Sequence, residues 1–235
     1  MNLSVIVALA GQGKRMNCSV PKQFLEFIGR PLFIYTLEEI EKSPCVSEII
    51  LVTRSEYIEY LNAMVEKYQL KKVNKIVEGG TERQDSIENG IKVVDENADF
   101  IAVQDGVRPL VKASYFDKSI EILEKNEKLD GVVVGVQAKD TIKIVNASGM
   151  IEATPNRNTI FHAQTPQTFK KSTLKKAYSS ARDSNFIGTD DASVVEKFGG
   201  HVSILEGEYE NIKITTLGDL DIFKKFKETR DESKS

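Results

Sequence analysis

The chain has few of the residues that many enzymes use for covalent or metal chemistry. It contains two histidines, His162 and His201, and two cysteines, Cys18 and Cys45. Neither pair has the spacing of a metal site, so we assign neither histidine a catalytic role. Two cysteines are also too few for a disulfide framework. Their scarcity favours a reducing, cytoplasmic compartment.

Long apolar runs and excess positive charge are missing as well. No apolar segment is long enough to cross a bilayer, and the apolar start is too short for a signal peptide and lacks a basic lead. The net charge is -3, so no overall field attracts nucleic acid or an anionic membrane. We therefore expect neither a nucleic acid nor a membrane as a partner, and any anion site must be local.

A local anion site is predicted near the start of the chain. The apolar run from Leu3 to Leu9 is typical of a buried strand, and it ends where the glycines begin. Gly11 and Gly13 carry no side chain, so their amides can approach phosphate oxygens closely. The positive charge comes from three nearby cations: Lys14, Arg15 and Lys22. This combination predicts a triphosphate site at the carboxyl end of a strand.

Two better-known glycine loops do not fit this spacing. The dinucleotide fingerprint needs a third glycine where this chain has Met16, and the P-loop needs Ser or Thr where it has Arg15. From the glycines alone, a plain turn between a strand and a helix remains an equal alternative.

Apolar runs and amphipathic stretches alternate along the chain. This alternation predicts an α/β protein with a mostly parallel sheet covered on both faces, in one domain over residues 1–235. Strands are expected at 5–9, 48–53, 75–78, 100–104, 131–136 and 201–206, and helices at 32–42, 55–68, 84–96, 114–126 and 192–197. The charge-dense tail from 224 to 235 is expected to be a fraying helix end.

One segment breaks the alternation. Within residues 138–164, two short alternating stretches at 141–145 and 149–153 flank a turn at 146–149, which predicts a hairpin-like β-arm. Such an arm is either a solvent-exposed decoration or, because it carries Arg157, a part that serves a partner subunit.

Two further motifs place polar groups beside predicted strands. Asp105 follows an apolar strand, where open α/β sheets bind ligands, and its carboxylate suits Mg²⁺ bound together with phosphate oxygens. An Asp that caps the next turn is an equal alternative. The segment from Gly79 to Ser86 offers backbone and hydroxyl groups to a base edge, or is simply a glycine turn with helix caps.

The C-terminal half supplies cations and hydroxyls that suit a polyol phosphate. Arg157 and Lys213 can bind phosphate, and threonines can bind hydroxyls. For Thr189 the alternative is the start of a helix cap, and for Lys213 an exposed strand position.

The motifs follow one another along the chain as AGQGKRM, PKQ, GGTERQDS, DGVRP, DTIK, TPNRN, TPQ, TDDAS and NIKIT. In this order they resemble the methylerythritol phosphate cytidylyltransferase family over nearly the whole chain. The resemblance implies a three-layer α/β/α sandwich of the nucleotide-diphosphosugar transferase (Rossmann-like) type, with a β-arm exchanged between the subunits of a homodimer. Two motifs depart from the family's usual residues: Leu9 stands where Ala is usual, and Gly106-Val107 where Ala-Ala is usual.

The resemblance also implies an activity and a set of site residues. The family transfers CMP from CTP to an alditol phosphate, 2-C-methyl-D-erythritol 4-phosphate, with magnesium, and supplies isoprenoid precursors. The implied catalytic residues are Arg15, Lys22 and Lys213. The implied nucleotide-binding residues are Ala8, Leu9, Ala10, Gly11, Gly13, Gly80, Thr81, Ser86, Asp105 and Gly106, with Asp105 also as metal ligand. The implied substrate-binding residues are Arg108, Thr141, Arg157, Thr165 and Thr189. Two alternatives are a D-ribitol 5-phosphate cytidylyltransferase and a non-catalytic nucleotide-binding regulator on the same fold.

Overall fold

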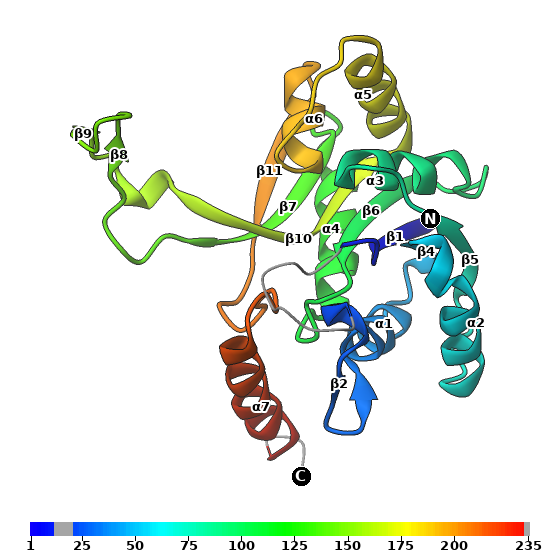
Figure 1. Cartoon of the computed structure of the whole chain (residues 1–235). Helices are drawn as coiled ribbons and strands as arrows, with labels where there is room; N and C mark the ends of the chain where they lie inside the picture. Colours follow the sequence, from blue (N-terminus) through cyan, green and yellow to red (C-terminus); the bar gives the residue numbers. More distant parts are fainter. Residues whose placement is uncertain (12–20, 233–235) are drawn as a thin grey trace.

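The computed structural model describes residues 1–11 and 21–232, and its centre is a seven-stranded sheet (Figure 1). The strand order is β11-β7-β10-β6-β1-β4-β5. These strands are β1 (Leu3–Ala8), β4 (Val46–Thr53), β5 (Val73–Glu78), β6 (Phe100–Asp105), β7 (Gly131–Gln137), β10 (Phe161–Lys170) and β11 (Val202–Glu206).

All strands of this sheet run in one direction except β10, which is antiparallel to both of its neighbours, β6 and β7. The prediction of a mostly parallel sheet is therefore confirmed. Because β1, β4 and β6 are parallel neighbours, their carboxyl ends lie together at one edge. The residues that follow these three strands are thus brought side by side.

Helices cover both faces of the sheet. Successive side chains of β1 point to opposite faces and are apolar, so both faces must be covered. Leu3, Val5 and Val7 belong to the core on one face, where the helices are α1 (Leu32–Glu41), α2 (Ile58–Lys67) and α4 (Ala113–Lys125). Ile6 points to the opposite core, under α3 (Arg83–Lys92), α5 (Lys171–Asp183) and α6 (Asp191–Lys197). The three-layer α/β/α sandwich is confirmed.

Smaller elements lie around this core. A hairpin of β2 (Glu26–Phe27) and β3 (Arg30–Pro31) packs near α7 (Leu217–Glu232), which buries Phe223 completely against Tyr35 and Phe27. Short 3-10 turns occur at η2 (Lys22–Phe24), η3 (Ser55–Tyr57) and η4 (Arg157–Thr159). The charge-dense tail is thus helical as far as Glu232.

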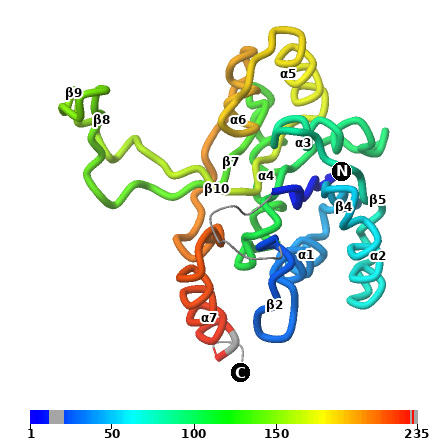
Figure 2. Tube along the Cα trace, in the orientation of Figure 1, coloured from blue at the N-terminus to red at the C-terminus, as the bar shows by residue number. Residues whose placement is uncertain are grey.

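The predicted hairpin is present, with shorter strands than expected: β8 (Ile144–Val145) pairs with β9 (Ile151–Ala153). Two extended segments carry this hairpin away from the body of the molecule (Figure 2). Its apolar side chains are exposed, among them Met150 at 67% and Ile151 at 61%. The last residues of the predicted arm, from Phe161, already belong to β10.

Among the strands of the main sheet and the helices that cover it, strand β10 and helix α5 were not expected from the sequence. The small β2–β3 hairpin was not expected either. Within the described residues, no helix has the length and apolar character needed to span a membrane.

Candidate functional site

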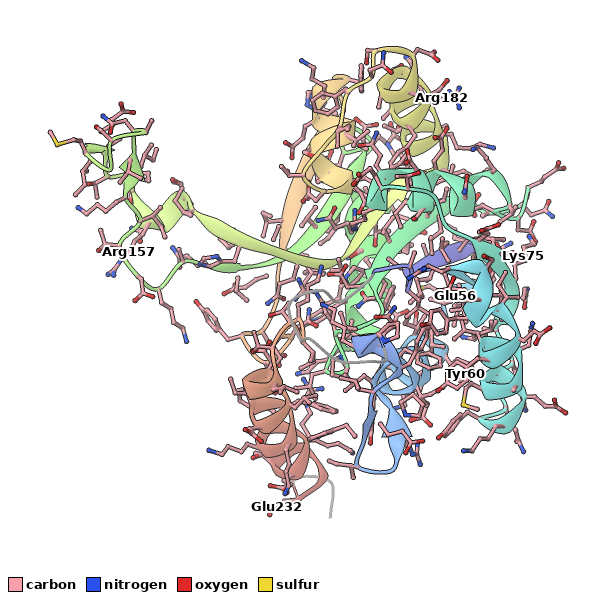
Figure 3. All side chains as sticks on the ribbon, in the orientation of Figure 1. Glu56, Tyr60, Lys75, Arg157, Arg182 and Glu232 are labelled. Atoms are coloured by element: carbon pink, nitrogen blue, oxygen red, sulfur yellow. The ribbon has the colours of Figure 1, made fainter. Side chains whose placement is uncertain are left out.

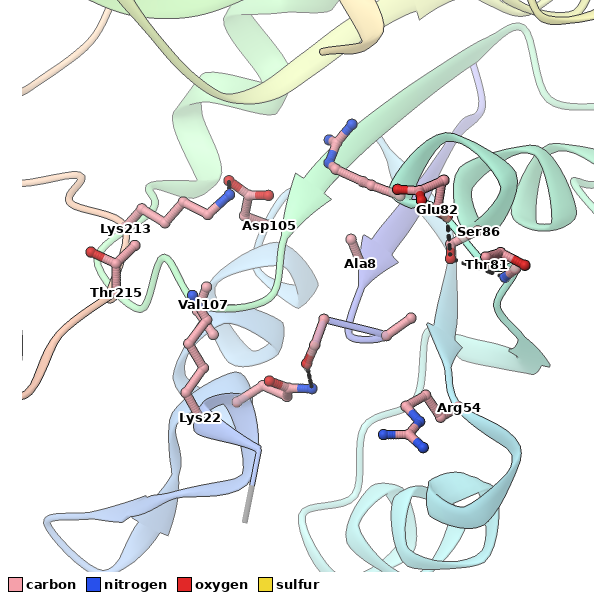
Figure 4. A pocket seen from close by; sticks show the side chains of 15 residues that line it. Ala8, Lys22, Arg54, Thr81, Glu82, Ser86, Asp105, Val107, Lys213 and Thr215 are labelled. Atoms are coloured by element: carbon pink, nitrogen blue, oxygen red, sulfur yellow. Dashed lines mark hydrogen bonds and ion pairs between the residues drawn. The ribbon is translucent and has the colours of Figure 1, made fainter. Parts of the chain in front are cut away.

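A pocket of about 650 Å³ opens at the carboxyl edge of the sheet, between β1, β4, β6, η2 and the start of α3 (Figure 4). Nine predicted site residues line it: Ala8, Ala10, Gly11, Lys22, Gly80, Thr81, Ser86, Asp105 and Lys213. Six further lining residues had no predicted role: Gln23, Arg54, Glu82, Arg83, Val107 and Thr215. The structure therefore gathers motifs from five separate parts of the chain into one site.

The other predicted residues are not among the described residues that line the pocket. Gly13 and Arg15 are outside the described residues. Of the others, Leu9, Gly106, Arg108 and Thr165 are buried around the pocket, whereas Thr141, Arg157 and Thr189 are exposed. Arg157 lies on the arm, well away from the pocket of its own chain (Figure 3), and its Nη1 donates to the carbonyl of Lys139 at 3.1 Å.

Asp105 is the buried anion of the pocket. Its Oδ2 lies 3.0 Å from Lys213 Nζ and 3.2 Å from Arg108 Nε, and its backbone N–H donates to Thr165 Oγ1 at 3.1 Å. Burial alone would raise the pKa of Asp105, but the nearby charges of Lys213, Arg108 and Arg83 outweigh it and lower the pKa to about 2. Asp105 therefore stays ionised and holds Lys213 at the pocket wall.

This carboxylate should make the fold sensitive to acid. Its pKa is lower in the folded chain than the ordinary value of 3.8, so its stabilising effect is complete above about pH 4 and is lost as the pH falls through about 2. The contribution is on the order of 2 kcal/mol. In urea denaturation, we expect the stability difference between the wild type and Asp105→Asn to be constant near neutral pH and to shrink below pH 4. A difference that persists unchanged to pH 2 would contradict this role.

The donors of the pocket restrict the kind of metal ion it can bind. Across residues 1–11 and 21–232, no three His, Cys, Asp or Glu side chains are grouped to hold a metal. The described lining includes the carboxylates of Asp105 and Glu82. Mg²⁺ is commonly held by one or two carboxylates together with substrate phosphates and water. The residues present therefore fit a magnesium ion shared with a bound triphosphate rather than a protein cage.

The opposite wall is the turn before α3. Ser86 Oγ accepts from the backbone N–H of Gly80 at 3.0 Å and donates to the carbonyl of Glu82 at 3.0 Å. A Cβ on Gly80 would lie 2.3 Å from Asp85 Cβ, so only glycine fits there. Glu82 and Asp85 form a capping box for α3. Ser86 thus fixes the backbone of the turn that faces the pocket.

Arg83 brings an unpredicted cation to this wall. Its guanidinium lies 2.6 Å from Asp191 Oδ2, and Tyr178 donates to Asp191 Oδ1 at 2.6 Å. Burial would lower the pKa of Arg83, but Asp191 overcomes that effect and raises it. The neighbouring motif residue Asp190 caps α6 by accepting from Ser193 N at 2.9 Å, so this motif contains a helix cap, and the cap residue is Asp190 rather than Thr189.

Arg54 is a second unpredicted cation of the pocket. It directly follows β4, as Asp105 ends β6, and its Nη2 lies 2.8 Å from Glu56 Oε1 in an exposed pair. Arg54 could have been predicted by the argument used for Asp105, since both are charged residues at the carboxyl end of a parallel strand.

Leu9 and Gly106 pack against each other beneath the pocket floor. Leu9 is 1% exposed, and a Cβ on Gly106 would lie 2.2 Å from Leu9 Cδ2. The Leu9 side chain therefore occupies the space that the missing Cβ of Gly106 leaves.

Comparisons with known proteins agree with one another. The profile of the family described as 2-C-methyl-D-erythritol 4-phosphate cytidylyltransferase matches residues 3–226. A protein of that name from Fusobacterium nucleatum is 44% identical over 223 residues, which are 94% of this chain and 95% of the relative. Another from Clostridium botulinum is 41% identical over 217 residues, which are 92% of this chain and 93% of the relative.

Solved structures give the same result. The 4-diphosphocytidyl-2C-methyl-D-erythritol synthase of Anaerococcus prevotii is similar with a TM-score of 0.81 at 34% identity, over 93% of this chain and 94% of that one. The 2-C-methyl-D-erythritol 4-phosphate cytidylyltransferase of Francisella tularensis has a TM-score of 0.78 at 29% identity, over 94% and 97%. The chain therefore belongs to the 2-C-methyl-D-erythritol 4-phosphate cytidylyltransferase family of nucleotidyltransferase enzymes.

Proposed function

We propose that this enzyme transfers CMP from CTP to 2-C-methyl-D-erythritol 4-phosphate and releases pyrophosphate. The observation that carries the proposal is the pocket at the carboxyl edge of the sheet, where Lys22 and Lys213 line the same cavity as the bare backbone of Gly11. Such a combination of lysines and open backbone suits a triphosphate.

The reaction needs no general base. An oxygen of the alcohol's phosphate attacks the α-phosphorus of CTP, and the bond from that phosphorus to the bridging oxygen breaks, so pyrophosphate leaves with its electron pair. A phosphate monoester has a second pKa near about 6 and is mostly dianionic at neutral pH. What the site must supply is positive charge for two anions that meet and for the transition state.

We assign that task to the lysines of the pocket. Lys22 and Lys213 would hold the triphosphate and stabilise the attacked phosphorus, together with Arg15, which lies outside the described residues. Asp105 orients Lys213 through their 3.0 Å ion pair. Asp105 would also hold Mg²⁺, which when bound neutralises phosphate oxygens and aids the departure of pyrophosphate. Gly80, Thr81 and Ser86 would face the base.

The test is pyrophosphate release from CTP and Mg²⁺ in parallel reactions with 2-C-methyl-D-erythritol 4-phosphate and with D-ribitol 5-phosphate. We expect turnover with the first only. Turnover with D-ribitol 5-phosphate would indicate a ribitol phosphate cytidylyltransferase instead. No pyrophosphate release with either substrate would favour a non-catalytic nucleotide-binding regulator. Nothing in the comparisons favours either alternative.

We also propose that the enzyme is a cytosolic homodimer in which each β-arm reaches the partner's pocket. An isolated two-stranded hairpin is only marginally stable in water, and this one exposes Ile144, Val145, Met150 and Ile151. Exposed apolar patches of this kind commonly mark protein contacts. A partner's pocket would also give Thr141 and Arg157 a substrate to bind.

Arg157→Ala should raise the KM for the alcohol phosphate more than the KM for CTP, because Arg157 would bind only the former. Steady-state kinetics with each substrate varied in turn measure both values. Equal effects on the two constants would contradict the assignment.

A mixing experiment tests whether Arg157 acts across the dimer. Lys22→Ala and Arg157→Ala proteins are mixed, dissociated and reassociated, so that about half of the dimers are mixed and each of these has one intact site. At an alcohol phosphate concentration far below the raised KM of Arg157→Ala, where neither parent dimer turns over, activity should recover to about a quarter of the wild-type value. Recovery would fail if Arg157 served the pocket of its own chain.

A further inference from the structure

A buried glutamine after Lys22 binds the backbone of the glycine segment, which is defined here as residues 8–11. Gln23 lies in η2, directly after Lys22, and is 3% exposed. Its Nε2 donates to the carbonyl oxygen of Leu9 at 2.5 Å and to that of Gly11 at 3.0 Å. A side-chain amide nitrogen carries two hydrogens, so both donors of Gln23 are used on this segment.

The chain is held in place on both sides of these hydrogen bonds, at Leu9 and at Phe24. Leu9 N–H donates to the carbonyl of Val52 at 2.8 Å, so the chain after β1 remains tied to β4. On the other side, the ring of Phe24 is 5% exposed and packs on Phe33 with ring centroids 5.7 Å apart. Gln23 therefore connects a fixed point of the sheet to the turn that carries Lys22.

The bridge also has an electrostatic consequence. Carbonyl oxygens carry partial negative charge and would repel a triphosphate in the same pocket. The amide of Gln23 occupies the oxygens of Leu9 and Gly11 as acceptors. Because these two carbonyl oxygens already accept hydrogen bonds from Gln23, their repulsion of a bound anion is reduced.

We propose that Gln23 is a positioning residue for nucleotidyl transfer, which sets the distance between the glycine segment and Lys22. This proposal rests on the proposed function, since it assumes that Lys22 acts on the triphosphate. Gln23 itself need not touch the substrate. Its effect is to hold the ammonium group and the bare backbone in the geometry that binds CTP.

The decisive variant is Gln23→Met, which keeps the length of the side chain and removes both donors. We expect kcat/KM for CTP to fall about 10- to 100-fold through misplacement of Lys22, whereas the KM for the alcohol phosphate stays within about twofold. The matched control is Gln84→Met. Gln84 also makes two hydrogen bonds to backbone, to Phe186 O and from Gly188 N at 2.9 Å each, but it lies outside the pocket lining.

A second readout needs no substrate and so separates this proposal from the proposed activity. In hydrogen exchange of the unliganded protein, peptides that end at Gly11 or begin at Pro21 should exchange faster in Gln23→Met, with β4 and β6 unchanged. If Gln23→Met does not fold, the same comparison uses Gln23→Leu, which also lacks the donors. Unchanged exchange, or CTP kinetics equal to those of Gln84→Met, would overturn the proposal.

Discussion

Replacing Lys22 by alanine is expected to lower kcat about 100- to 1000-fold, the largest catalytic effect of any single change among the described residues. The ammonium group lines the pocket where the triphosphate would lie, and the attacked phosphorus gains negative charge in the transition state. An interaction that strengthens in the transition state affects kcat, whereas one equally strong in the bound substrate affects KM. Pyrophosphate release at saturating CTP measures the effect.

The matched control for this prediction is Lys118→Ala. Lys118 is an exposed lysine of α4, outside the lining of the pocket, so its removal changes the net charge equally without touching the site. We expect wild-type turnover from it. A Lys22→Ala enzyme with near-normal kcat would contradict the role of Lys22, and the same prediction applies to Arg15.

The largest expected effect on stability comes from Asp191→Asn. Asp191 is completely buried and holds both Arg83 and Tyr178, whose phenol has a raised pKa because of burial and the adjacent carboxylate. The carboxylate is buried although the Arg83 side chain is 38% exposed, and its neutralisation weakens the charge-assisted hydrogen bonds to Arg83 and the bond from Tyr178. We therefore expect a loss of about 3 kcal/mol in the free energy of unfolding. Urea denaturation near pH 7 measures it.

Asp183→Asn provides the comparison. Asp183 is the last residue of α5, and its side chain is 72% exposed in a long pair with Arg182 at 3.7 Å. Exposed pairs of this kind contribute between about 0 and 1 kcal/mol. If the two substitutions lower the free energy of unfolding equally, the burial of the Asp191 carboxylate adds nothing to the strength of its interactions.

The sheet was predictable because each parallel strand is a short apolar run. Strand β10 was not, since Thr165-Pro166-Gln167 is polar and a proline argues against a central strand. In the structure Pro166 falls where the pairing of β10 with β7 shifts register, between Ala163 and Gln167. Helix α5 was not predicted because its apolar pattern is weak: two of its four buried residues are the small alanines Ala177 and Ala181.

The site was predictable where a motif follows a strand or a glycine turn, as for Lys22 and Asp105. Arg83 stood inside a recognised motif, but its partner Asp191 lies 108 residues further along, and no local pattern joins them. The place of Arg157 also lies beyond local signals. Arg157 lies on the arm between β7 and β10, and its position depends on the direction in which these two strands leave the sheet.

The contact between Leu9 and Gly106 couples the two positions. A Cβ at position 106 would lie 2.2 Å from Leu9 Cδ2, so Gly106→Ala forces the leucine side chain to move. In a Leu9→Ala background the same added methyl group would not meet that side chain. The effects of the two substitutions on stability are therefore expected to be non-additive.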